Sequence, residues 1–257
     1  MKVATYQCLS VLDKDKNISR AKEIITKASK NNCDLVVFPE LFLTGYSSND
    51  YIKNSAFTLK DNSILTLQKL CKESNIACVV GFAKTEKKKV FNSACFIDKN
   101  GKIAGVYDKT HLWGGEKSVF EPGDELNVIE TSMGKVGLLI CYDIEFPEPA
   151  RILASKGADF ICCISANMKP YDDVHKTFIK ARALENMVPV IYCNYVGDDG
   201  NFVYVGQSNV IDSDGKDVSR FSKKVELKFA QINIHKEKTD ISNYFSDIRN
   251  DLYQLKY

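Results

Sequence analysis

Short apolar segments recur along the whole chain, and most are bounded by polar or charged residues. Many contain β-branched and aromatic residues, and they are too short to be separate buried helices, so they predict β-strands. The predicted strands are 2–8, 34–38, 77–83, 91–98, 102–108, 135–141, 159–165, 189–195, 203–211 and 225–234.

Between several of these segments, apolar residues recur at the spacing of one face of an α-helix. In the segment 17–32 these residues are Ile18, Ala21, Ile24, Ile25 and Ala28. Prolines and Glu148 at the start, with the sequence SKG at the end, predict a further helix that begins at Pro147. The predicted helices are 17–32, 59–75, the one from Pro147, and 173–188.

Strands that alternate with helices predict an α/β fold with a largely internal sheet. The segment 90–109 contains a Lys-Asn-Gly turn between two predicted strands, and 210–218 contains a similar turn, so part of the sheet is expected to be antiparallel. This number of strands suggests two packed mixed sheets with helices outside. No linker, repeat or low-complexity segment is visible, so residues 1–257 are expected to form one domain.

Composition and charge narrow the function. The chain has 257 residues, of which 44% are hydrophobic, and this is enough for a sizeable core. The balance of 35 basic and 33 acidic residues leaves a net charge of +2, and the basic run at 84–90 reads as a solvated hairpin. A nucleic-acid partner therefore has no electrostatic support. The first ten residues lack a signal-peptide core and no apolar run reaches transmembrane length, so we expect a cytoplasmic protein with no membrane contact.

The nine cysteines show no zinc-type spacing. Most lie inside apolar segments, where reduced cysteines act as small buried hydrophobic residues. Cys141 is the candidate exception, because it ends the apolar segment 135–141 and is followed by acidic residues.

Two other predicted strands also end next to a chemically capable side chain. Glu40 follows the strand 34–38, and Lys109 follows the strand 102–108. In open α/β sheets, ligands bind in the crevice at the carboxyl ends of strands. Glu40, Lys109 and Cys141 are therefore expected to converge in one crevice.

These residue types suit nucleophilic catalysis. A thiol is a weak nucleophile until a base removes its proton. None of the three histidines directly ends a buried strand, but Glu40 can be the base if burial raises its pKa. Lys109 and the backbone N–H of Tyr142 would stabilise an oxyanion, and Glu116, on a glycine-rich loop, could orient Lys109 or the substrate.

Each of these side chains also has an ordinary structural interpretation. Cys141 could be a core thiol, Glu40 a helix cap or a surface acid, Lys109 a solvated strand end and Glu116 a loop charge. The shared placement at strand ends is what favours the catalytic interpretation.

Several blocks, in order along nearly the whole chain, resemble the nitrilase superfamily of carbon–nitrogen hydrolases, whose catalytic set is Glu-Lys-Cys. The blocks are DLVVFPELFLTGY, YDKTHLW, GEKSVFEPGD, VGLLICYDIEFPEPAR, SANMKPY, KARALENMVPVIYCNYVG and YFSDIRNDLY. The resemblance implies an αββα sandwich that pairs with itself into a four-layer homodimer. It also implies a thioester acyl-enzyme, hydrolysed by water that Glu40 activates, and no metal or organic cofactor.

The residues after the nucleophile suggest a branch of this superfamily. Nitrilases carry Cys-Trp-Glu, whereas Cys141-Tyr142-Asp143 resembles the amidases, which release a carboxylic acid and ammonia. Members that cleave anionic substrates often place arginine three or four residues after the cysteine, where this chain has Ile144 and Glu145. Glu145 would repel a carboxylate, so a small neutral or cationic carboxamide is the expected substrate.

The remaining expectations concern the surroundings of the thiol. The helix from Pro147 would bring its N-terminal dipole near Cys141 and favour the thiolate. Arg182 and Glu185 could form an ion pair that supports the site, or an ordinary helix-surface pair. The candidate substrate-binding residues are Tyr142, Trp113, Glu145, Asn167 and Met168, with Phe120 and Tyr171 as further pocket walls. For the aromatic and methionine side chains, core packing is an equally good interpretation.

Two alternatives to an amidase remain open. An N-carbamoyl amine hydrolase would use the same catalytic residues and release ammonia and carbon dioxide, and Glu145 could then pair with a distal amine. A catalytically idle scaffold or binding protein on the same fold is the alternative from another class. The intact Glu40, Lys109 and Cys141 argue against it.

Overall fold

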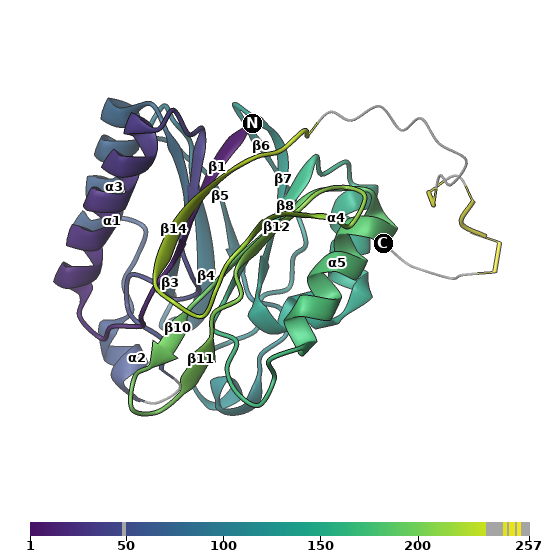
Figure 1. Ribbon diagram of the computed structural model, residues 1–257. Helices are drawn as coiled ribbons and strands as arrows, with labels where there is room; N and C mark the ends of the chain where they lie inside the picture. The colour runs from purple at the N-terminus through teal and green to yellow at the C-terminus, as the bar shows by residue number, and fades with distance from the viewer. Residues whose placement is uncertain (48–49, 235–243, 246, 250, 253–257) are drawn as a thin grey trace.

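Two six-stranded β-sheets face each other, and helices cover the outer face of each (Figure 1). The computed structural model describes residues 1–47, 50–234, 244–245, 247–249 and 251–252. Helices α1 (Lys14–Lys30) and α3 (Asn62–Ser74) lie against one sheet, and α4 (Pro147–Ser155) and α5 (Val174–Asn186) lie against the other. The predicted αββα sandwich is confirmed.

The first sheet has the strand order β14-β1-β2-β3-β4-β5. Its strands are β1 (Lys2–Gln7), β2 (Leu35–Val37), β3 (Ala77–Glu86), β4 (Lys89–Ile97), β5 (Ile103–Asp108) and β14 (Glu226–Gln231). Strands β1, β2 and β3 are parallel, and β3, β4 and β5 form an antiparallel meander. Because two antiparallel steps restore the direction, β2 and β5 end at the same edge of the sheet.

The second sheet has the order β13-β12-β9-β8-β7-β6. Its strands are β6 (Val128–Thr131), β7 (Gly134–Ile140), β8 (Phe160–Ser165), β9 (Val190–Asn194), β12 (Asn209–Ile211) and β13 (Asp217–Arg220). Strands β7, β8 and β9 are parallel, and α4 and α5 connect them. A short ribbon of β10 (Val196–Asp198) and β11 (Val203–Val205) forms a separate antiparallel pair.

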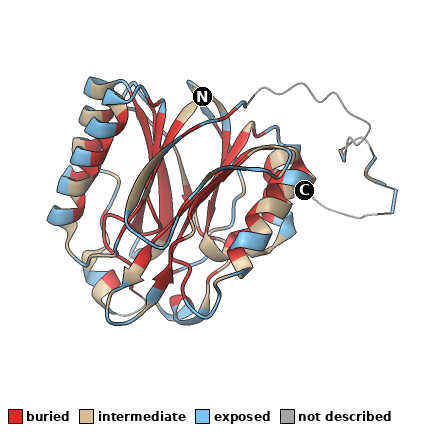
Figure 2. Cartoon of the chain, in the orientation of Figure 1, coloured by how far each residue is buried: buried red, intermediate tan, exposed pale blue. Residues whose placement is uncertain are grey.

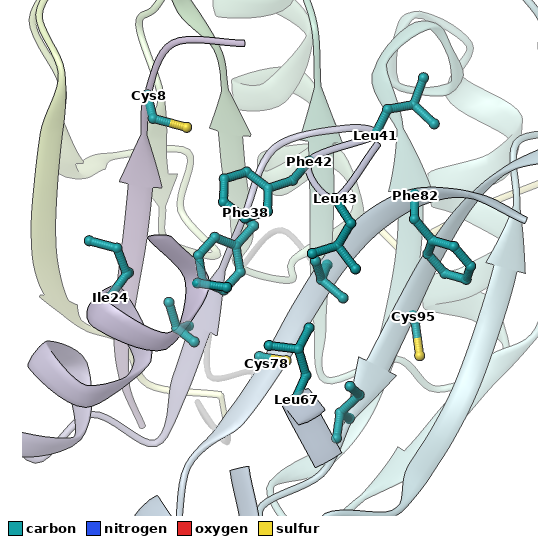
Figure 3. Close-up of a cluster of buried hydrophobic side chains, with 14 of the residues drawn as sticks. Cys8, Ile24, Phe38, Leu41, Phe42, Leu43, Leu67, Cys78, Phe82 and Cys95 are labelled. Carbon is teal, nitrogen blue, oxygen red and sulfur yellow. The ribbon is translucent and has the colours of Figure 1, made fainter. Parts of the chain in front are cut away.

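The core has three apolar layers, and alternate residues of a strand enter different layers. In β7, Leu138 and Ile140 pack between the two sheets, whereas Leu139 packs under α4 and α5. Figure 3 shows the layer between the first sheet and its helices, which includes Phe38 and Leu67. Strands with two covered faces appear as continuous apolar segments in the sequence, and Figure 2 shows them buried while the helices expose one face.

Some predicted elements differ from the observed ones. The segment 203–211, expected as one strand, is divided into β11 and β12 because Gly206 and Gln207 have φ angles of +67° and +60° and turn the chain out of the sheet. Four short elements were not predicted from the sequence: α2 (Asp50–Ser55), β6, β10 and β13. The predicted turn at 210–218 joins β12 and β13, which pair antiparallel as expected.

Within the described part of the chain, no helix combines the length and the apolar character needed to cross a membrane.

Candidate active site

Three strand ends from two sheets meet at one site. Glu40 follows β2, Lys109 follows β5 directly, and Cys141 follows β7 directly. The sequence predicted a crevice at the edge of a single open sheet. The structure instead brings the strand ends of two facing sheets together, and Cys141 interacts electrostatically with both Glu40 and Lys109.

Lys109 joins two carboxylates in a buried ionic cluster. Its Nζ atom lies 2.8 Å from Glu40 Oε1, and 2.9 and 2.8 Å from the two carboxylate oxygens of Glu116. The side chains are almost fully buried, with at most 1% exposed. Tyr46 Oη and the backbone N–H of Trp113 also donate to Glu116, so its orientation is fixed.

The two oxygens of Glu40 have different surroundings. Oε1 accepts hydrogen bonds from Lys109 Nζ at 2.8 Å and from Asn92 Nδ2 at 2.7 Å. Oε2 is buried and has no hydrogen-bond partner among the described residues. A buried, unpaired carboxylate oxygen is unfavourable, and functional sites are where such atoms persist. Oε2 is therefore free to accept a proton.

A glycine in β3 makes room for the turn that carries Glu40. A Cβ atom on Gly81 would lie 2.4 Å from the backbone nitrogen of Leu41 and 2.7 Å from the carbonyl oxygen of Pro39. The φ angle of Leu41 is +51°, so this turn is also strained. Close backbone packing between β3 and the turn thus positions Glu40.

Cys141 lies at a sharp change of backbone direction between β7 and the short 3-10 helix η2 (Cys141–Glu145). Its φ angle is +49°, an uncommon conformation for a residue other than glycine. The preceding strand residues are buried, whereas Cys141 is partly exposed. The expected turn that exposes the thiol is present, and the backbone N–H groups at the start of η2 follow it directly.

Asp143 connects the turn after Cys141 to the segment that carries Lys109. Its buried carboxylate accepts hydrogen bonds from Tyr107 Oη, Thr110 Oγ1, the backbone N–H of His111 and the backbone N–H of Ile140, at 2.8 to 3.0 Å. A carboxylate accepts such bonds with both oxygens, and each bond to a charged group is stronger than a neutral one. Asp143 therefore fixes the turn that carries Cys141 relative to the end of β5.

We expect the substitution Asp143→Asn to reduce both stability and the reactivity of the thiol. The new NH2 group would face donors, so the free energy of unfolding should fall by about 2–3 kcal/mol. Urea unfolding and the rate of Cys141 alkylation measure the two effects. The control is Asp159→Asn, just before β8, whose carboxylate accepts a hydrogen bond from the backbone N–H of Lys135. An alkylation rate equal to that of the wild type would contradict the positioning role.

The charges around the thiol shift its pKa and those of its neighbours. Burial raises the pKa of Glu40 to about 7, against the opposing effect of the Lys109 ammonium group. Burial alone would lower the pKa of Lys109, but the charges of Glu116 and Glu40 outweigh it and raise this pKa. Lys109 therefore stays protonated, and Glu40 can exchange a proton near neutral pH.

Burial and charge oppose the thiolate that the dipole of the helix from Pro147 was expected to favour. Burial and the negative charge of Glu40 raise the pKa of Cys141 well above its ordinary value, and Lys109 offsets this only in part. A raised pKa favours the neutral thiol in the resting site, so a base is needed to take its proton before it can act as a nucleophile.

A cavity of about 190 Å³ opens onto Cys141. All of the predicted substrate-binding residues line it: Tyr142, Trp113, Glu145, Asn167 and Met168. Tyr171 lines it too, whereas Phe120 packs into the hydrophobic core beside the first sheet, which was the other interpretation left open for it. Tyr46 and His175 also line the cavity and were not predicted.

The site residues that were not predicted differ in whether the sequence could have revealed them. Asn92 is a buried polar residue inside an otherwise apolar strand, which is unusual enough to suggest a function. His175 lies on α5 and reaches the cavity through the packing of that helix, which the local sequence does not reveal. His235 lies outside the described residues.

Arg182 does more than form a helix-surface pair. It is buried, and it donates to the backbone carbonyls of Ile144, Glu145 and Phe146 as well as to the Glu185 carboxylate. Of the two interpretations left open, the supporting role fits, because Arg182 holds the turn that follows the nucleophile.

Across the described ranges, no group of three or more histidine, cysteine or acidic side chains is arranged to hold a metal ion.

Known proteins provide an independent comparison. The (R)-stereoselective amidase of a Pseudomonas species is 39% identical over 202 residues, which cover 78% of this chain and 73% of that protein. The citrullinase of Francisella tularensis is 32% identical over 240 residues, covering 85% and 84% of the two chains.

A solved structure extends the similarity to the fold. The amidase from Nesterenkonia sp. AN1 superimposes with a TM-score of 0.87 and 26% identity over 98% of both chains. In that structure, acrylamide is bonded to the active-site cysteine, and another structure of the same amidase holds butyramide. The sequence model of the carbon–nitrogen hydrolase family matches residues 2–239, which is most of the chain. The chain therefore belongs to that family.

Proposed function

We propose that the protein hydrolyses a small carboxamide to a carboxylic acid and ammonia, with Cys141 as the nucleophile. The observation that carries this proposal is the buried cluster beside the thiol. In it, Lys109 binds one oxygen of Glu40, and the other oxygen has no hydrogen-bond partner in the part of the chain that the structure describes. An ammonium group and an available carboxylate oxygen next to a thiol are what acyl transfer requires. The amidases among its relatives support the same reaction.

In the first half of the reaction, Glu40 takes the proton from Cys141 while the sulfur attacks the carbonyl carbon of the amide. The C–S bond forms and the carbonyl oxygen becomes an oxyanion, which Lys109 and the backbone N–H of Tyr142 stabilise. Protonated Glu40 then gives its proton to the nitrogen, the C–N bond breaks, and ammonia leaves. The acyl group remains on Cys141 as a thioester.

In the second half, the same carboxylate acts on water. Glu40 takes a proton from a water molecule as the oxygen attacks the thioester carbon, and Lys109 again stabilises the oxyanion. The C–S bond breaks, the carboxylic acid leaves, and the proton on Glu40 returns to the sulfur. Glu116 supports both halves because it holds the ammonium group of Lys109 in place.

The cavity restricts the size and the charge of the substrate. Its volume of about 190 Å³ is below the roughly 300–1,000 Å³ of pockets for drug-sized ligands, so the substrate is small. Glu145 lines the cavity and would repel a carboxylate. A neutral or cationic carboxamide fits this cavity better than the amide of a dicarboxylic acid.

Hydrolysis of an N-carbamoyl amine is the second candidate. The similarity to a citrullinase favours it, because that name implies cleavage of a ureido group by a relative of this chain. A catalytically idle scaffold is less well supported, because the side chains needed for catalysis are assembled at the site.

Ammonia release from a small panel tests the proposal. The panel contains butyramide, alaninamide, glutaramate and carbamoylputrescine, and carbon dioxide is measured for the last. We expect release from the first two, little from glutaramate, and no carbon dioxide. Carbamoylputrescine as the best substrate would favour the second candidate. Strong preference for glutaramate would contradict the role of Glu145. If no member reacts and Cys141 is alkylated no faster than the other thiols, the idle scaffold is supported.

The pKa of Glu40 predicts the pH dependence. Only the carboxylate form can accept the thiol proton, so kcat/KM should rise with pH through a pKa near 7. The substitution Glu40→Gln should reduce turnover by about 10²- to 10⁴-fold and remove this rise from any residual activity. A stopped ammonia assay across pH measures both. The same acidic limb in Glu40→Gln would assign the titration to another group.

The proposed protein is a homodimer in a reducing compartment. The resemblance to the superfamily supports a homodimer, which light scattering of the purified protein tests. The nine cysteines are free in the structure, and this supports a reducing compartment such as the cytoplasm.

A further inference from the structure

Glu145 places a carboxylate inside the cavity that opens onto Cys141. It is the last residue of η2, and its side chain is 27% exposed. Arg182 donates to its backbone carbonyl oxygen at 2.9 Å, so the guanidinium group holds the backbone at this position. The mechanism proposed above gives no role to this carboxylate.

His175 fixes the orientation of that carboxylate without cancelling its charge. Its Nε2 atom lies 3.2 Å from Glu145 Oε1, and its Nδ1 atom lies 2.8 Å from Tyr192 Oη. The imidazole is buried, and this burial lowers the pKa of His175 despite the nearby carboxylate. Its neutral form can donate from Nε2 to Glu145 and accept at Nδ1 from a neighbouring hydroxyl, since both Tyr192 Oη and Ser165 Oγ lie within hydrogen-bond distance of Nδ1. The Glu145 side chain is thus held in place and keeps its negative charge.

The rest of the cavity also suits a cation. Among the described residues that line it, none is lysine or arginine, and Glu145 is the only acidic side chain. Lys109 lies nearby, but Glu40 and Glu116 already bind its ammonium group. The walls are rich in aromatic rings, including Trp113 and Tyr171, whose ring centroids lie 5.9 Å apart. Aromatic faces attract ammonium groups, so the walls and the carboxylate favour the same charge.

We propose that Glu145, held by His175, is a binding site for an ammonium group on the substrate. The preferred substrates would be amides that carry an amino group, and this inference rests on the amide hydrolysis proposed above. Glu145 follows Cys141 by four residues in η2, and both line the same cavity of about 190 Å³. So small a cavity fits an amino group one or two carbons from the amide carbonyl, as in an α- or β-amino carboxamide.

Matched substrates separate the effect of charge from that of size. Alaninamide and isobutyramide differ by an ammonium group in place of a methyl group, and β-alaninamide and butyramide form a second such pair. At a pH where the amine is protonated, the wild type should have the higher kcat/KM for the cationic member of each pair. A preference for the neutral member in both pairs would overturn the inference without any substitution.

The substitution Glu145→Gln tests the residue. For each pair, the kcat/KM of the cationic amide is divided by that of the neutral amide. The substitution should lower this ratio by about 10- to 100-fold, because a hydrogen bond to a charged carboxylate becomes one to a neutral amide. The control Glu148→Gln removes the same charge from an exposed position at the start of α4, and it should leave the ratio unchanged. An equal ratio in the wild type and Glu145→Gln would overturn the inference.

Binding measurements keep this inference separate from the proposed reaction. Calorimetry with Cys141→Ala should show tighter binding of alaninamide than of isobutyramide, and the added substitution Glu145→Gln should remove the difference. If the wild type hydrolyses neither amide but the binding difference is present, the proposed function fails and the ammonium site stands. If both amides are hydrolysed but bind equally, the ammonium site fails and the function stands.

Discussion

Replacing Cys141 with alanine is expected to abolish ammonia release while the fold is retained. The sulfur forms the covalent bond to the acyl carbon, and no other described side chain at the site can replace it. Loss of the nucleophile of a serine protease lowers kcat by about 10⁶-fold, and we expect a loss of the same order here. The thiol is partly exposed at the end of β7, so its loss leaves little of the core unfilled. Serine should be nearly as inactive, because a hydroxyl is much harder to deprotonate.

The Cys141 variants need a matched control and a folding check. Cys33→Ala removes a buried cysteine from the segment between α1 and β2, away from the cavity, and should keep turnover within a few-fold of the wild type. Circular dichroism and thermal unfolding compare the variants with the wild type. Turnover by Cys141→Ala close to that of Cys33→Ala would remove Cys141 from the mechanism.

Replacing Lys109 with methionine is expected to lose both activity and stability. The ammonium group stabilises the oxyanion, and loss of one such donor costs about 10²- to 10³-fold in kcat. It also neutralises two buried carboxylates, Glu40 and Glu116. Removing one partner from a buried ion pair costs about 3–5 kcal/mol, because a charge is left uncompensated. Ammonia release and urea unfolding measure the two losses.

A second substitution separates the two effects of Lys109. The double variant Lys109→Met/Glu116→Gln removes one charge of each sign, so it should recover part of the lost stability and none of the activity. The neighbouring exposed Lys117→Met is the control for loss of a lysine and should match the wild type in both measurements. Turnover by Lys109→Met at the wild-type level would exclude an oxyanion role for this residue.

The sequence predicted the layers of the fold better than the details of the site. Buried strands such as β7 and β8 are continuous apolar segments, so periodicity and turn residues were enough to find them. The short strands β6, β10 and β13 carry few apolar residues and depend on pairing with neighbours. Gly206 and Gln207 divide a strand through their backbone angles, which the apolar pattern does not reveal.

The predicted strand ends located the candidate catalytic residues along the chain. They did not show the burial and the charges that surround each side chain in the site. Glu40 and Cys141 could be found because each follows a recognisable buried strand, and Lys109 because it follows the half-buried strand β5. The raised pKa of the Cys141 thiol could not be predicted from the sequence, because it depends on how far burial and the Glu40 charge outweigh Lys109. His175 was also missed, because a residue on α5 reaches the cavity only through the packing of that helix on the second sheet.

The most direct test of the central claim is the location of the acyl group during turnover. The wild type and Glu40→Gln are each mixed with an amide that the wild type hydrolyses well, and the reactions are quenched in acid. The proteins are then digested, and the masses of the peptides are measured by mass spectrometry. We expect the acyl mass on the peptide that contains Cys141 in the wild type, and a slower appearance of it in Glu40→Gln, because formation of the thioester also needs Glu40. Acyl mass on a different peptide, or undiminished turnover after complete alkylation of Cys141, would contradict this expectation.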